Sequence, residues 1–235
     1  MSGLSLIASE PQAAALFLDV DGVLAPIVDR PADARVPDET RDELRRLAGR
    51  YALVAVVTGR PSSAAAAIVG VREVRYAGEH GLELEAEAAA WAEAIHGFAS
   101  GAGWPATEVK PRSAAFHFRT AADPAAAERE LGRIEQAAVA LGFKTRWGRM
   151  VLEVLPPLEI TKGTAVRALL AESGLRRALY AGDDTTDLNG FEALDGLDVA
   201  VRVAVASPDG PPELVHRADI VVGSPAAFLA LLREL

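Results

Sequence analysis

Short apolar runs alternate with longer stretches of helical pattern along most of the 235-residue chain. The runs are continuous in apolar residues and end at Gly, Asp or Thr, which is typical of strands buried on both faces. They cover residues 15–20, 51–57, 75–78, 177–181, 199–203 and 219–222. Helical patterns begin near Pro37, at Lys162 and at Pro225. Strands that alternate with helices predict an α/β fold with a parallel sheet.

The middle of the chain has a different pattern. Residues 100–103 predict a flexible, Gly-rich stretch, and Pro156-Pro157 marks a second break. Between them, strand-like runs at 108–110, 114–119, 143–147 and 151–155 flank a helix that starts at Asp123-Pro124, a favourable cap and first residue. We therefore expect a small inserted α+β domain at 104–158, which divides the core into residues 1–103 and 159–235.

Composition and charge narrow the class of protein. Half of the residues are hydrophobic and 24% are charged, as in soluble globular proteins. No apolar run approaches the roughly 20 residues that cross a bilayer, and the N-terminus lacks a basic signal region. The absence of cysteine excludes thiolate metal sites, and the net charge of -9 argues against nucleic acid. We expect a cytoplasmic monomer that binds a small molecule, and neither nucleic acid nor a membrane.

Polar residues follow the first two predicted strands. Asp19 and Asp21 come at the end of the first, and ligand sites in open α/β sheets lie at the carboxyl ends of strands. One carboxylate can attack phosphorus while the other moves a proton. Thr58, Gly59 and Arg60 end the second strand, where a hydroxyl and an amide can hold phosphoryl oxygens of a substrate. Taken singly, each segment is better explained as a turn or a helix cap.

Two later segments add charge. Lys162 begins a helix, where its charge opposes the helix dipole, so either a phosphate or carboxylate partner or full solvation is expected. Asp183, Asp184 and Asp187 follow a buried strand and repel one another unless a cation lies among them. Oxygen ligands without His or Cys suit Mg²⁺. Chance turns seldom produce these four segments in this order at successive element ends.

In this order, DVDG, VTGR, KG and GDDTTD resemble the four motifs of the haloacid-dehalogenase-like phosphatases. The resemblance implies a Rossmann-like parallel-sheet core with an inserted cap of type II (C2B-like). It implies an aspartyl-phosphate mechanism, with the following roles: Asp19 the nucleophile, Asp21 the general acid/base, Thr58 a phosphate ligand, and Lys162 the charge that steadies the intermediate. It also implies Mg²⁺ held by the side chains of Asp19 and Asp183 and the backbone carbonyl of Asp21, with support from Asp184 and Asp187.

Further segments are similar to the trehalose-6-phosphate phosphatase family: LFLDVDGVLAPIV, AGEHGLEL, FHFR, VLEV and KGTAVRALL. This resemblance implies hydrolysis of trehalose 6-phosphate, with sugar hydroxyls bound by Glu108, Lys110 and Glu153. Carboxylates accept hydrogen bonds from hydroxyls, and an ammonium donates to them. By the same analogy, His80 and Gly81 face the sugar side of the pocket.

The sequence departs from the family at two places. Val23 stands where Thr is usual, and Leu188-Asn189 replaces Glu-Asp. Neither change touches an atom that the resemblance assigns to catalysis. The alternatives are a related phosphatase that acts on sucrose phosphate or mannosyl phosphoglycerate, a phosphate-sensing receiver domain, and a sugar-phosphate-binding protein without catalysis. The receiver domain is disfavoured because such modules lack a folded insert and the D-x-D pair.

Overall fold

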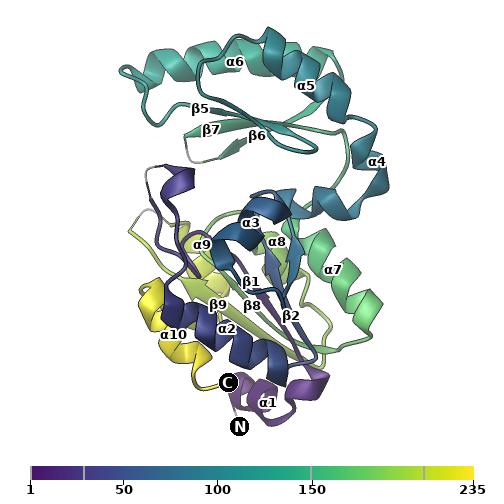
Figure 1. The fold of residues 1–235 in the computed structure, drawn as a ribbon, viewed down its shortest axis with the longest axis vertical. Helices are drawn as coiled ribbons and strands as arrows, with labels where there is room; N and C mark the ends of the chain where they lie inside the picture. The colour runs from purple at the N-terminus through teal and green to yellow at the C-terminus, as the bar shows by residue number, and fades with distance from the viewer. Residues whose placement is uncertain (1, 29, 149, 209) are drawn as a thin grey trace. The chain divides into compact units, whose positions relative to one another are not determined.

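The computed structural model describes residues 2–28, 30–148, 150–208 and 210–235, and it divides into two compact units (Figure 1). The core unit comprises Met1–Gly81 and Ile160–Leu235, and the insert unit comprises Leu82–Glu159. Each unit has its own sheet and its own hydrophobic core, as expected of a domain.

The core unit contains a six-stranded parallel sheet with the strand order β10-β9-β8-β1-β2-β3. The strands are β1 (Ala15–Leu18), β2 (Leu53–Val57), β3 (Arg75–Ala77), β8 (Arg177–Gly182), β9 (Val199–Val205) and β10 (Ile220–Val222). The predicted α/β core with a parallel sheet is thereby confirmed.

Helices cover both faces of this sheet, and alternate strand residues face each side. Leu16 and Leu18 share one apolar cluster with residues of α1 (Gly3–Ser9), α2 (Asp38–Arg50), α3 (Ser62–Val69) and α10 (Pro225–Leu232). Ala15 and Phe17 share the other with residues of α7 (Lys162–Ser173), α8 (Asp187–Glu192) and α9 (Pro212–Arg217). Burial on both faces explains why the strands are continuous apolar runs. The described residues also form the short 3₁₀ segments η1 (Pro11–Ala13), η2 (Pro31–Asp33) and η3 (Glu79–Leu84), the last of which is interrupted by non-helical backbone at His80 and Gly81.

Strand β1 lies between β2 and β8 in this sheet. Leu18 pairs with Val56 of β2 and with Ala181 of β8, so the three strands end at the same edge. The chain passes from β1 to β2 on one side and later enters β8 on the other. This edge is therefore a topological switch point, where open α/β sheets bind their ligands.

The insert unit has a four-stranded antiparallel sheet with the order β4-β5-β7-β6. Its strands are β4 (Thr107–Val109), β5 (Ala114–His117), β6 (Lys144–Gly148) and β7 (Val151–Leu155), and its helices are α4 (Ala86–Ala89), α5 (Ala92–Gly101) and α6 (Pro124–Ala140). Helices α5 and α6 cover one face of the sheet (Figure 1), where Phe116 and Leu152 are fully buried. The Asp123 cap accepts from the amide of Ala126 at 2.9 Å, as its position predicts.

The insert unit begins before the Gly-rich stretch. The prediction of a flexible segment there was wrong for Ser100 and Gly101, which are the last residues of α5. Ile95 and Ala99 of that helix are buried in the core of the insert unit. Because α5 contributes its apolar side to this core, the unit includes residues 82–103 as well as 104–158, and it ends at Glu159.

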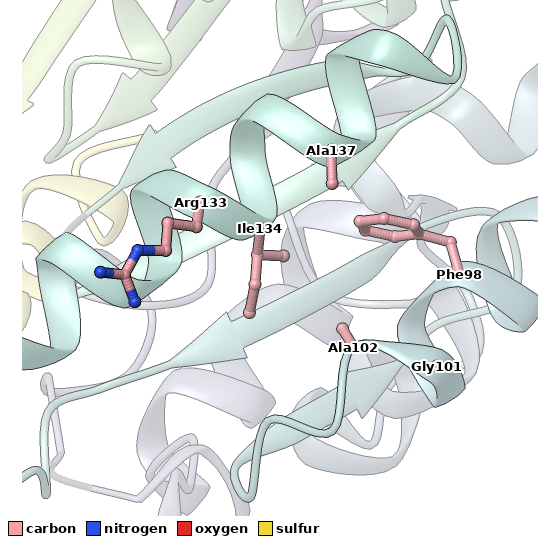
Figure 2. Close-up of a pocket in the computed structure, with 6 residues that line it drawn as sticks. All are labelled: Phe98, Gly101, Ala102, Arg133, Ile134 and Ala137. Atoms are coloured by element: carbon pink, nitrogen blue, oxygen red, sulfur yellow. The ribbon is translucent and has the colours of Figure 1, made fainter.

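An apolar pocket of about 360 Å³ lies between α5 and α6 (Figure 2). Its lining residues are Phe98, Gly101, Ala102, Arg133, Ile134 and Ala137. Arg133 is the one charged residue among them, so the pocket does not have the polar lining that a sugar phosphate requires. Within the described residues, we find no helix with the length and apolarity to cross a membrane.

Candidate active site

Asp19 is the first residue after β1 and lies at the switch point. Its amide donates to the carbonyl of Ala181 at 3.1 Å, which extends the pairing with β8 by one residue. Its side chain is buried, and the two carboxylate oxygens have different partners. Oδ1 accepts from the amide of Val20 and Oδ2 accepts from Nζ of Lys162, both at 2.7 Å. The carboxylate is therefore held in one orientation.

Lys162 is the first residue of α7, and its ammonium is buried with a relative exposure of 2%. Nζ donates to Asp19 Oδ2 and Asp187 Oδ1, each at 2.7 Å. Burial alone lowers the pKa of Lys162, but the carboxylates of Asp187 and Asp19 outweigh burial and hold that pKa above its usual value. The side chain is therefore a fixed cation, and the alternative of a solvated surface lysine is excluded.

Asp187 is fully buried and accepts four hydrogen bonds. Oδ1 accepts from Lys162 Nζ and from the hydroxyl of Tyr180, both at 2.7 Å. Oδ2 accepts from the amides of Asp183 and Asp184, both at 3.0 Å. Tyr180 was not predicted as a site residue. Its signal in the sequence is a phenol in an otherwise aliphatic buried strand, because a buried hydroxyl needs a partner.

Asp19, Asp183 and Asp187 form an acidic cluster. One carboxylate oxygen from each lies within 4.8 Å of the others. Burial, with the charges of Asp19 and Asp187, raises the pKa of Asp183 to about 9. Burial also raises the pKa of Asp19 to about 7, although Lys162 opposes this shift. Burial and the crowding of three carboxylates around a single lysine thus favour the protonated forms of Asp183 and Asp19.

Gly22 is required where the loop after β1 meets this cluster. Its φ is +78°, a conformation that L side chains rarely adopt. A Cβ atom on Gly22 would lie 2.1 Å from Oδ2 of Asp183. The Gly of the DVDG segment therefore lets the two acidic loops approach each other.

The acidic cluster fits a hard divalent cation. Its donors are all carboxylate oxygens, and it lies at the switch point among buried side chains. Asp187 already accepts four hydrogen bonds, so Asp19 and Asp183 have the greater capacity for a metal ion. Asp184 is turned into its own loop, where Oδ1 accepts from the amide and hydroxyl of Thr185. These residues indicate a metal site, with Asp187 and Asp184 holding the loop.

Thr58, Gly59 and His80 come together where β2 and β3 end. Thr58 is buried, and its carbonyl accepts from the amide of His80 at 2.8 Å. A Cβ atom on Gly59 would lie 2.5 Å from Nε2 of His80, so only glycine permits this contact. His80 has a φ of +58°, and Gly81 has a φ of +103°. Thr58 and Gly59, which follow β2, therefore lie next to His80, which follows β3.

Arg60 and Asp21 form a two-point ion pair. Nε of Arg60 donates to Asp21 Oδ2 at 2.6 Å, and Nη2 donates to Oδ1 at 2.7 Å. The third nitrogen, Nη1, donates to the carbonyl of Pro31 at 3.0 Å. Arg60 was predicted to bind substrate, whereas these contacts direct its guanidinium to Asp21.

In the insert unit, the residues predicted to bind sugar lie in or beside one sheet: Glu108 in β4, Glu153 in β7 and Lys110 directly after β4. Glu153 Oε1 accepts from Lys110 Nζ at 2.9 Å, and Oε2 accepts from Nε of Arg146 at 2.9 Å and also from its Nη2. Glu108 Oε2 lies 2.9 Å from Nε2 of His117. Arg146 was not among the predicted site residues.

The strand register explains this grouping. Glu108 pairs with Ala115, Ala115 pairs with Glu153, and Glu153 pairs with Arg146. Directly paired residues point to the same face of a sheet. The row therefore places two acids and a guanidinium on one face, with a small alanine between the acids. Residues 144–148 (Lys-Thr-Arg-Trp-Gly) do not alternate between apolar and polar, so the sequence offered no signal for Arg146.

Comparison with known proteins identifies the family. The model of the family described as trehalose-phosphatase matches residues 17–101 and 106–211. The chain belongs to the trehalose-phosphatase family. It is 34% identical over 243 residues to a protein named trehalose-phosphate phosphatase from Mycobacterium avium, which covers 92% of this chain and 58% of that protein.

A second relative is longer. An uncharacterized glycosyl hydrolase of Mycobacterium tuberculosis is 36% identical over 213 residues, which cover 80% of this chain and 16% of that protein. The chain therefore spans only part of the length of these two relatives.

A solved structure extends the likeness to the fold. The C-terminal domain of trehalose-6-phosphate phosphatase from Candida albicans aligns with a TM-score of 0.73 at 21% identity, over 97% of this chain and 93% of that domain. The fold is the haloacid-dehalogenase-like α/β fold. Membership of this family excludes the receiver-domain alternative.

Proposed function

We propose that the protein hydrolyses trehalose 6-phosphate to trehalose and phosphate, with Mg²⁺ as its cofactor. The observation that carries the proposal is the buried network in which Lys162 joins Asp19 to Asp187 beside Asp183 at the switch point. Such a network presents an oriented carboxylate next to fixed positive charge, which is what nucleophilic attack on a phosphate monoester needs. The name of the M. avium relative supports the choice of substrate.

In the first step, a carboxylate oxygen of Asp19 attacks phosphorus and the ester P–O bond breaks. Asp21, in its protonated form, gives its proton to the departing sugar oxygen. The products of this step are free trehalose and an acyl phosphate on Asp19. Thr58 and the Gly59 amide hold the phosphoryl oxygens, and Lys162 offsets the charge that collects on them.

In the second step, Asp21 is a carboxylate and acts as a base. It takes a proton from water, and the water oxygen attacks the phosphorus of the acyl phosphate. The P–O bond to Asp19 breaks, which restores the Asp19 carboxylate and releases phosphate. Asp21 is then protonated again for the next cycle.

Asp19, Asp183 and the backbone carbonyl of Asp21 would hold Mg²⁺, with Asp184 and Asp187 supporting their loop. When bound, the ion supplies positive charge that neutralises the phosphoryl oxygens. All of these ligands are hard oxygen donors, the class that Mg²⁺ prefers.

The insert unit would recognise the sugar. Glu108, Lys110 and Glu153 offer acceptors and a donor on one sheet, a combination that suits the vicinal hydroxyls of a disaccharide. The second candidate function is hydrolysis of another glycosyl phosphate, such as sucrose phosphate or mannosyl phosphoglycerate. It differs from the first only in the contacts that the insert unit makes.

A panel of sugar phosphates with released phosphate as the readout tests the proposal. We expect kcat/KM to be highest for trehalose 6-phosphate, and we expect Asp19→Asn to abolish turnover. The amide is nearly isosteric with the carboxylate but does not attack phosphorus, so the circular dichroism spectrum should be unchanged. Preference for sucrose 6-phosphate would overturn the substrate. Asp19→Asn activity within about tenfold of wild type would overturn the nucleophile, because covalent catalysis contributes far more.

A further inference from the structure

The guanidinium of Arg60 is held on all three nitrogens. Nε and Nη2 donate to the two oxygens of Asp21, and Nη1 donates to the carbonyl of Pro31. The side chain is 15% exposed, compared with 32% for Asp21. A planar fork that meets a carboxylate at two points fixes the plane of the carboxylate as well as its position. Arg60 therefore determines where the oxygens of Asp21 point.

The backbone on both sides of this pair is fixed. The amide of Arg60 donates to Oγ1 of Thr58, and its carbonyl accepts from the amide of Glu79 at 2.9 Å. Asp21 lies in a bridge with Ala25, and the neighbouring amide of Gly22 donates to the carbonyl of Ala25 at 2.8 Å. With the backbone fixed, the remaining freedom of Asp21 is its side-chain rotamer. The two hydrogen bonds from Arg60 fix that rotamer.

We propose that Arg60 is a positioning residue for Asp21 and not a ligand of the transferred phosphoryl group. This inference rests on the proposed role of Asp21 as the general acid and base. Each oxygen of a carboxylate has two lone pairs, so a proton can occupy one while Arg60 donates to another. Lysine would place a single charge near Asp21 without the two-point contact that orients it.

The inference predicts an effect that depends on the leaving group. A sugar alkoxide needs a proton to depart, whereas p-nitrophenolate leaves without one. A misplaced Asp21 should therefore slow the first step for the sugar phosphate and spare p-nitrophenyl phosphate. For Arg60→Gln we expect kcat/KM to fall about 100-fold on trehalose 6-phosphate and less than about fivefold on p-nitrophenyl phosphate, because general acid catalysis contributes roughly 10²–10⁴-fold.

The second step gives an independent readout. It needs Asp21 as a base whichever ester formed the acyl phosphate, so Arg60→Gln should accumulate that intermediate. With p-nitrophenyl phosphate, we expect a burst of p-nitrophenol close to one equivalent of enzyme, followed by slow turnover. Inhibition by inorganic phosphate should keep its wild-type inhibition constant, since the phosphoryl ligands are untouched.

A double-mutant cycle separates action through Asp21 from direct contact with substrate. Adding Arg60→Gln to Asp21→Asn should change kcat/KM by less than about twofold, because the residue through which Arg60 acts is already disabled. Arg60→Lys should show the same dependence on leaving group in weaker form. If the Gln variant does not fold, as judged by circular dichroism and thermal unfolding, the Lys variant replaces it in every comparison.

Equal losses on both esters together with a weakened inhibition by phosphate would show that Arg60 is a phosphoryl ligand, and would overturn the inference. A further large loss in the double variant would do the same. The failure of the proposed function is distinguishable, because wild-type protein would then release no phosphate from trehalose 6-phosphate, whatever it does with p-nitrophenyl phosphate.

Discussion

The Asp187 carboxylate has its four acceptor positions filled from inside the protein. Tyr180, Lys162 and two backbone amides supply the donors. A carboxylate in this state orients its donors and has little capacity left for a metal ion. Asp187 therefore shapes the site by aiming Lys162 at Asp19 and by closing the acidic turn. The hydroxyl of Tyr180 fixes the rotamer of Asp187 from the adjacent strand.

The acidic cluster makes the metal-free protein sensitive to pH. The pKa is about 9 for Asp183 and about 7 for Asp19, against ordinary values of 3.8. Raised pKa values mean that the folded state holds these protons after the unfolded chain has lost them. The stability that they contribute is complete below about pH 4 and is lost as pH rises through about 7 and then about 9.

We therefore expect the Tm of the metal-free core unit to fall between about pH 5 and about pH 9. Asp183→Asn should flatten the fall, because the amide does not ionise. Asp42→Asn is the matched control, since its exposed carboxylate pairs with Arg45 on α2, outside the cluster, and its replacement should leave the slope as in wild type. Scanning calorimetry with chelator present measures this, and about 2–4 °C corresponds to 1 kcal/mol for a domain of this size. A wild-type Tm that does not change with pH would contradict the assignment.

In the insert sheet, Arg146 of β6 is paired directly with Glu153 of β7. Glu153 is buried, and its two oxygens accept from Lys110 and Arg146. Two cations hold this carboxylate in place on the face of the sheet that also presents Glu108. Arg146 thus acts on sugar recognition by holding Glu153 in place.

We expect Arg146→Gln to lower kcat/KM for trehalose 6-phosphate about 10-fold or more and to leave p-nitrophenyl phosphate nearly unchanged. Losing hydrogen bonds to a charged group costs about 1.5–3 kcal/mol, and about 1.4 kcal/mol is a factor of ten. The matched control is Arg133→Gln, which removes an exposed arginine of the same unit that pairs with Glu130. Equal losses on both substrates would mean that Arg146 serves the stability of the sheet instead.

The proposed catalytic residues and the proposed sugar-binding residues of the insert sheet lie in different units, each with its own hydrophobic core. Asp19, Asp183 and Asp187 all belong to the core unit, so the proposed metal site is complete within it. Binding to the folded state alone stabilises a protein by mass action. Metal should therefore stabilise the core unit directly.

Chelation by EDTA should stop phosphate release, and Mg²⁺ should restore it. Mg²⁺ should also raise the Tm of the core unit, a readout that does not depend on activity. Asp183→Ala should lose both responses or require far more Mg²⁺, because it removes a proposed ligand. Phosphate-release and calorimetric titrations measure the two effects. Full activity after exhaustive chelation would contradict the metal assignment.

Local patterns in the sequence determined most elements of the fold. The six strands of the core sheet were predicted because burial on both faces leaves continuous apolar runs. Helix α7 begins at Lys162 and α10 at Pro225, as their start signals predict. The boundaries of the insert unit were harder to predict, because the Gly-rich end of α5 resembles a linker in the sequence. Only the contacts of α5 with the insert core show that this helix belongs to the unit.

The order of the motifs identified Asp19, Thr58, Lys162 and Asp183 as candidate site residues, because each lies at one end of a predicted strand or helix. The tertiary structure decided which of them touch. Lys162 reaches Asp19 across 143 positions, and Arg60 reaches Asp21 across 39. The pairing of Arg146 with Glu153 depends on the register of two strands. Sequence periodicity assigns a residue to an element and a face, whereas the partner of a side chain depends on how distant strands align, which the fold as a whole determines.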